Sequence, residues 1–255
     1  SFNTSIGNLA GRGRQDSTST YGECTFVGFS AGRYIEGGVR NTFVGYQCGG
    51  DSSMGNLNNN TGVGSDCFLH LQTGDQNTAI GREALQYLET GDRNTACGSE
   101  ALKLHTGNDA TAVGFNALKN HSNSTGNTAV GTYAAENATN PNNVTAVGFE
   151  AYRAGLGAQR ITAIGYRALA NCSGNGASHN TAVGHEALAS QSSRNSCTAV
   201  GAFALRNCTA DDNTAVGMQT LQDLAGGVYN TAIGRLALEN TITGTRNVAM
   251  GGLCA

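Results

Sequence analysis

The sequence predicts an all-β protein, a parallel β-solenoid of about 15 coils with about 17 residues in each coil. A five-residue phrase, best preserved as Asn-Thr-Ala-Val-Gly, recurs fifteen times, and nine of the fourteen gaps between its glycines are 17 residues long. The chain has 37 Gly, 1 Pro and no Trp, which suits a narrow interior of small side chains. A fixed, short period is typical of coils that stack on their neighbours.

The phrase itself has the alternation of a β-strand, for example over residues 77–80, 94–97 and 127–130. Thr stands three residues before the glycine in fourteen repeats, and an aliphatic residue, Met or Cys directly before it in all fifteen. Ala dominates the position between these two residues, and Asn dominates the position before the Thr. We therefore expect Thr and Val on one face of a strand and Asn and Ala on the other. The best-preserved members of these structural columns are Thr78, Thr95, Thr128, Val130, Asn77 and Asn127.

The glycine that ends each phrase, as at Gly81, Gly131 and Gly165, is predicted to satisfy a backbone requirement. A Cβ there would block either an unusual backbone conformation or a close approach between coils. We expect the Asn and Thr columns to form hydrogen-bonded ladders along the stack, which is a structural role.

A second apolar stretch follows each glycine. A small residue, usually Ala, stands three positions after it, and Leu follows in eight repeats, as in Glu83-Ala84-Leu85. The stretch is short and bounded by glycine, so a second strand is favoured over a helical turn. The rest of each coil is rich in Gly, Asn and Ser and is predicted to form turns. Residues 1–255 are read as one solenoid domain, uncapped at both ends, about 70 Å long at roughly 4.8 Å per coil.

Charge and hydropathy exclude several function classes. Charged residues make up 13% of the chain and the formal net charge is −3. Binding to nucleic acid or to an anionic membrane surface needs clustered Lys and Arg, so neither partner is expected. No apolar run approaches the roughly 20 residues of a membrane-spanning helix.

The repeated phrase, followed by a small residue and Leu, resembles the head repeats of trimeric autotransporter adhesins and the repeats in fibres of bacteriophages and large viruses. The resemblance covers nearly the whole chain. It implies a left-handed parallel β-roll, side-by-side association of three chains, and an outer surface that binds host matrix or glycans. The Ala columns support the trimer independently, since small side chains would let sheets from different chains approach closely.

Eight cysteines form no CxxC pair and no Cys/His metal spacing, so no metal or cofactor site is expected. Cys48 and Cys67 hold equivalent positions on adjacent coils, roughly 5 Å apart in a regular stack, and are a candidate disulfide. Sequons for N-glycosylation also occur. The candidate acceptors are Asn120, Asn123, Asn137, Asn143, Asn171 and Asn207, with Asn3 and Asn59 completing the set.

The sequence favours a protein that is not an enzyme. Glu83 and Glu100 fall at the same point of adjacent coils, a spacing that would suit a retaining glycosidase. The same column holds Arg167, Phe203 and other residue types elsewhere, which indicates variable outward positions. The histidines show no partner spacing. No catalytic residue is therefore assigned.

We expect a structural or adhesive protein that forms the shaft or head of an extracellular or virion fibre. Self-association as a homotrimer or an end-to-end stack follows from the family resemblance and from uncapped sheet edges. Surface glycans or a matrix protein are the expected ligands, recognised by irregular loops at residues 12–21, 51–60 and 172–179. Two alternatives stay open: a purely structural filament subunit, and an ice-binding solenoid that uses the Thr column.

Overall fold

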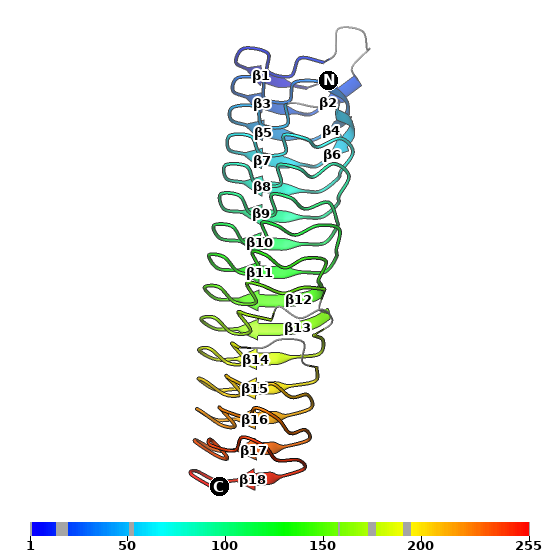
Figure 1. Cartoon of the computed structure of the whole chain (residues 1–255). Coiled ribbons are helices and arrows are strands. Elements are labelled where there is room, and N and C mark those ends of the chain that lie inside the picture. Colours follow the sequence, from blue (N-terminus) through cyan, green and yellow to red (C-terminus); the bar gives the residue numbers. More distant parts are fainter. Residues whose placement is uncertain are drawn as a thin grey trace. The chain divides into compact units, whose positions relative to one another are not determined.

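A computed structural model describes residues 2–13, 20–50, 54–157, 159–172, 177–190 and 195–254. These residues form strands and turns, and none of them is helical. The chain divides into two compact units, Ser1–Gly126 and Asn127–Ala255. Within each unit parallel strands stack one above another, one strand for each repeated phrase (Figure 1). The predicted fold class, an all-β parallel solenoid with a coil of about 17 residues, is confirmed.

In the first unit the main sheet is parallel and in register. Thr78 pairs with Thr95, and Ala79 with Ala96, so equivalent residues of the phrase lie directly above one another. The strands in sheet order are β1 (Thr4–Ile6), β3 (Thr25–Val27), β5 (Thr42–Val44), β7 (Thr61–Val63), β8 (Thr78–Ile80), β9 (Thr95–Cys97) and β10 (Thr111–Val113).

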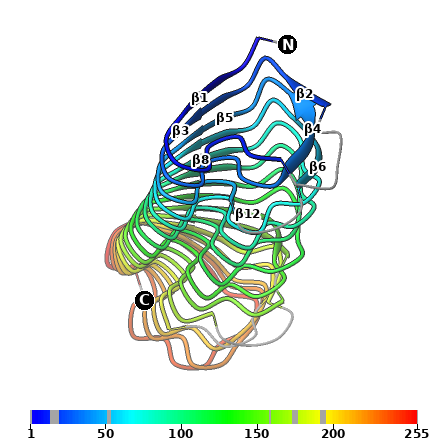
Figure 2. The ribbon, with the colours of Figure 1, turned by 90° about the horizontal axis from the view of Figure 1, so that it is seen from above.

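The first coils of this unit carry a second parallel sheet, made of β2 (Thr20–Gly22), β4 (Ile35–Val39) and β6 (Met54–Asn58). It lies across the coil from β1, β3 and β5 (Figures 1 and 2). The expectation of an irregular loop over residues 51–60 is wrong for Met54–Asn58, because Ile35 and Met54 pair in a regular register. Residues 14–19, 51–53 and 173–176 of the three expected recognition loops lie outside the described residues.

The second unit repeats the main sheet. Its strands are β11 (Thr128–Val130), β12 (Asn142–Val147), β13 (Gln159–Ile164), β14 (Thr181–Val183), β15 (Thr198–Val200), β16 (Thr214–Val216), β17 (Thr231–Ile233) and β18 (Val248–Met250). Val130 pairs with Val147, one coil further on. β12 and β13 are twice the usual length, and their pairing extends through Val144 and Ile161 to Asn142 and Gln159.

The two faces of the phrase separate as alternation predicts, and the structure shows which face is inside. Ala79, Ala129 and Ala163 are completely buried, whereas the residue before each glycine lies on the outer surface of the coil, exposed as at Ile80 or half-buried as at Val147. The Ala that follows each glycine by three residues is also buried from β8 onward, as at Ala84 and Ala134. The Ala columns therefore fill the coil interior, and the expectation that they bring different chains together is wrong.

The second stretch of the coil is not a strand, contrary to the expectation. It consists of turns in which residues two and four positions after the glycine have left-handed backbone, as at Glu83 (φ 58) and Leu85 (φ 49). Its amide groups still bond between coils: Leu85 N–H donates to Ala101 O at 3.1 Å, and Tyr87 N–H to Lys103 O at 3.0 Å. Stacking satisfies the backbone of this segment without a regular strand or helix.

Large side chains in the interior are matched by glycine on the opposite wall of the same coil. Phe43 points inward from β5, and a Cβ on Gly49 would lie 2.9 Å from its ring. In the next coil the ring comes from the other wall: Phe68 is buried, and a Cβ on Gly62 would lie 3.0 Å from it. Later coils mostly use Ala on the strand and Leu opposite. Interior volume is thus conserved while its source changes.

Candidate functional site

The outer face of the main sheet is a regular surface in each unit, formed by the Thr of each phrase and the residue before its glycine. We call this the Thr/Val face. It comprises Thr25, Val27, Thr42, Val44, Thr61, Val63, Thr78, Ile80, Thr95, Cys97, Thr111 and Val113 in the first unit, and Thr128, Val130, Thr145, Val147, Thr162, Ile164, Thr181, Val183, Thr198, Val200, Thr214, Val216, Thr231 and Ile233 in the second.

The residue before the glycine is exposed or half-buried at every rung of this face. Ile80 is 42% exposed, Val130 37% and Ile233 38%, and most of the Thr side chains beside them are half-buried. No charged residue belongs to it. A contiguous apolar strip with one hydroxyl per rung is chemically suited to contact with another apolar surface or with ordered water.

An aromatic ladder continues the exposed surface beyond the glycine in the second unit. Phe149 stacks on Tyr166 with ring centroids 5.6 Å apart, and Tyr166 stacks on His185 at 4.9 Å. Phe29 and Tyr46 make the same contact in the first unit at 5.4 Å. Within each stacked pair, each ring covers one face of the other.

The Asn column forms a buried ladder inside each unit. Asn77 Oδ1 accepts the backbone N–H of Asn94 at 2.9 Å, and Asn77 Nδ2 donates to Gly91 O at 2.6 Å. In the second unit Asn127 Oδ1 accepts the Val144 N–H at 3.0 Å. Each side chain therefore satisfies backbone groups that no strand partner reaches, which is a structural function.

The glycine column has no room for a side chain. Gly81, Gly131 and Gly165 have φ between 129° and 133°, and a Cβ on Gly131 would lie 2.5 Å from the carbonyl oxygen of Gly148 in the next coil. Both a left-handed backbone and a close approach require glycine here.

All eight cysteines are described, and no disulfide joins them. Sγ of Cys48 and Sγ of Cys67 lie 2.7 Å apart, both completely buried. The contact is possible because Gly62 faces it: a Cβ there would lie 2.6 Å from the Cys48 sulfur. Burial and the adjacent Cys67 thiol raise the pKa of Cys48. A disulfide between the two remains a prediction.

The candidate glycosylation sites differ in exposure. Asn123, Asn137, Asn143, Asn171 and Asn207 are exposed, and Asn120 is half-buried. Asn137, Asn171 and Asn207 share one coil position, six residues after the glycine. Glycosylation of these residues remains a prediction.

Glu83 and Glu100 lie together, and cations surround them. Arg82 and Lys103 form ion pairs with both carboxylates, and Lys119 Nζ lies 2.7 Å from Glu100 Oε2. The hydrogen bond from Lys119 is the largest influence on Glu100, whose pKa is lowered. A glycosidase general acid needs a raised pKa, so the arrangement is that of a surface ion-pair network.

Two histidines meet in the interior, which contradicts the expectation that the histidines have no partner spacing. Nδ1 of His105 lies 3.0 Å from Nδ1 of His121, and the rings stack with centroids 5.0 Å apart. Nε2 of His105 also bonds to Asn94 Oδ1 at 3.1 Å. Burial lowers the pKa of His105 to about 4. The sequence signal was their shared coil position, since both lie seven residues after a phrase glycine.

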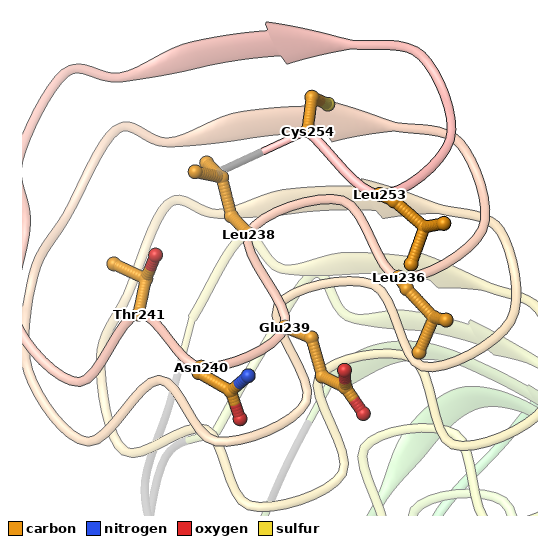
Figure 3. Close-up of a pocket in the computed structure, with 7 residues that line it drawn as sticks. All are labelled: Leu236, Leu238, Glu239, Asn240, Thr241, Leu253 and Cys254. Carbon is orange, nitrogen blue, oxygen red and sulfur yellow. The ribbon is translucent and has the colours of Figure 1, made fainter.

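A pocket of about 250 Å³ lies at the last coils of the second unit (Figure 3). It is lined by Leu236, Leu238, Glu239, Asn240, Thr241, Leu253 and Cys254. None of these belongs to the Thr/Val face. Among the described residues, no group of three or more His, Cys, Asp or Glu side chains could hold a metal ion. The same ranges contain no helix with the length and apolarity needed to cross a bilayer.

No protein-family model, curated protein or solved structure matches this chain.

Proposed function

We propose that this protein is a structural, self-associating component of a fibre, and that the Thr/Val face docks against the same face of further copies. The observation that carries the proposal is an outward column of Val and Ile, with one Cys, that is exposed or half-buried at every rung of an uncharged sheet face. Three copies side by side would bury this face around a common axis. End-to-end stacking of coils is the alternative mode of assembly.

A second copy is the partner that fits this face best. Every rung repeats the one below it in register, so the face presents identical groups at a fixed spacing. A partner can bury all rungs equivalently only if its own groups recur at that spacing. A second copy meets this condition, whereas an ordinary globular partner would match one or two rungs.

The proposed setting is extracellular or on a virion, where fibres of this kind act. Surface glycans or a matrix protein are the proposed ligands, and they would contact the turns rather than the Thr/Val face that assembly covers. A glycan array probed with the assembled protein tests this part. Binding that survives loss of assembly would separate recognition from fibre formation.

The test of self-association is light scattering coupled to size exclusion. We expect trimers or larger species for the native chain, and a shift toward monomer in the variant Val130→Lys/Ile164→Lys/Val200→Lys, which places three cations on the Thr/Val face. The matched control is Asn137→Lys/Asn171→Lys/Ser190→Lys, with equal charge on exposed turn positions. A native chain that stays monomeric at high concentration would refute the proposal.

Ice binding is a second candidate, favoured by one observation. The Thr column lies on the outer surface of a regular sheet, and not against a core, with one hydroxyl per rung beside one apolar group. Such an array can order water. Thermal hysteresis in dilute, monomeric protein would support this function, and its loss in the same Lys variant would assign it to the Thr/Val face.

A further inference from the structure

Two cysteines meet across the interior of one coil in the second unit. Cys197 stands four residues before the glycine, in the column otherwise dominated by Asn, and Cys208 stands seven residues after the same glycine. These two columns face each other inside the coil. In the first unit their equivalents are Asn94 and His105, whose side chains bond at 3.1 Å.

The two thiols share their surroundings. Sγ of Cys197 and Sγ of Cys208 each lie 3.3 Å from the carbonyl oxygen of Ala210. The Cys208 thiol also contributes, with burial, to a raised pKa of Cys197. Both side chains are completely buried. Because both sulfurs contact the same carbonyl oxygen, the two thiols lie at the same place in the coil interior.

We propose that Cys197 and Cys208 are a disulfide-forming pair that fastens β15 to the opposite wall of its own coil. The oxidant is a small-molecule disulfide. One thiolate attacks it and releases a small thiol, and the second protein thiolate then displaces the other half. One S–S bond is broken and one is formed, and the two protons end on the released thiols. Because both sulfurs are buried in the closed coil, the exchange takes place while the coil folds.

The same two columns hold two further cysteines, but in each case the residue in the facing column is not a cysteine. Cys24 occupies the Asn column of its coil, and the position seven after that glycine is Ile35. Cys172 occupies the opposite column of its coil, and the Asn column there holds Ile161. Both are buried like the proposed pair, so they control for burial alone.

The test is to refold the full chain from denaturant in a buffer of reduced and oxidised glutathione, alkylate under denaturing conditions, and map the tryptic peptides. Trypsin separates the pair, since Cys197 falls on the peptide 195–206 and Cys208 on 207–235. We expect these two peptides to be joined and the link to disappear on reduction, while Cys24 and Cys172 carry the alkylating group.

A functional readout uses the same protein. The oxidised chain should have a higher thermal midpoint than the reduced chain. This difference between oxidised and reduced protein should be smaller in Cys197→Ala/Cys208→Ala than in the native chain. The variant Cys48→Ala/Cys67→Ala isolates that link, because it keeps Cys197 and Cys208 and removes the other close pair. Alkylation of both Cys197 and Cys208 after refolding under oxidising conditions, or a link from either one to a different cysteine, would overturn the proposal.

Discussion

At the scale of single residues, the phrase glycine sets the distance between coils. On Gly131 a Cβ would meet the Gly148 carbonyl oxygen at 2.5 Å, and the backbone has φ 132°. The contact is with backbone, which cannot move away without separating two rungs. Glycine at this position thus follows from stacking wherever another coil comes next, as at Gly81, Gly131 and Gly165.

Replacing this glycine should be severely destabilising. For Gly131→Ala we expect a loss of about 3 kcal/mol or more in unfolding free energy, since overpacking and a strained backbone each cost about 1–3 kcal/mol. The control is Gly157→Ala, where φ is 59° and nothing lies within 4 Å of the added Cβ. It should lose only about 1 kcal/mol. Urea denaturation of both variants measures the difference, and equal losses would contradict the assigned role.

Interior volume is the second constraint at this scale. Gly49→Leu should be destabilising because the new side chain meets the Phe43 ring, although left-handed backbone by itself accepts Leu, as at Leu85. Adding Phe43→Ala reproduces the Ala79 and Leu85 pairing of a later coil. We expect the double variant to recover at least about 1 kcal/mol of the loss, a coupling typical of residues in contact. Additive losses in a double-mutant cycle would contradict volume exchange.

At the scale of the element, the Asn ladder substitutes for strand pairing. Asn77 satisfies the Asn94 N–H and the Gly91 carbonyl, which lie beyond the three-residue strand. Where the column instead holds Val144 and Ile161, the strands are longer and backbone pairing covers this position. Side chain and strand length therefore compensate each other.

Removing one rung of the ladder should be costly. Asn77→Val leaves buried backbone groups without partners, and we expect a loss of about 2 kcal/mol. Amide hydrogen exchange at Asn94 should accelerate. Thr78→Val, on the outward face of the same strand, is the control and should change stability by less than about 0.5 kcal/mol. Unchanged exchange protection of the Asn94 amide would show that the Asn77 side chain does not protect it.

The buried His105 makes its coil sensitive to acid. Its pKa is lowered to about 4 by burial, so between pH 6.5 and 4 the unfolded chain binds a proton that the folded chain does not. Stability therefore falls as pH falls through this window, by up to about 3 kcal/mol. His105→Leu/His121→Leu follows the Leu88 pattern of the same column and should flatten this dependence. Denaturation at pH 7 and pH 4.5 measures it.

Sequence pattern was sufficient for some elements and not for others. The register of Val130 on Val147 and the alternation of the two strand faces follow from a period-2 phrase at a constant spacing. The turn geometry at Glu83 and Leu85 does not, because left-handed backbone has no residue signature when stacking enforces it. Contacts across the coil, such as the one between His105 and Asn94, depend on this turn geometry. The sequence pattern therefore did not predict them.

At the scale of the whole molecule, both units present the same outward chemistry. Each has an uncharged Thr/Val face, and beside it charged residues that are largely neutralised by one another, as in the Glu150 contacts with Arg153 and Arg167. In the proposed assembly, paired charges on the turns and apolar groups on the sheet favour the sheet face as the surface that associates. The proposed assembly follows from this division.

A native cysteine provides the most direct test of the central claim, that the column before each glycine faces outward and is covered by another copy. Cys97 occupies this column and is exposed, whereas Cys48 and Cys172 are buried, and burial raises the pKa of Cys172 to about 11. Maleimide should label Cys97 first in dilute protein, and its labelling should slow as concentration drives assembly. A Cys97 as unreactive as Cys48 in monomer, or equally reactive at all concentrations, would contradict the account.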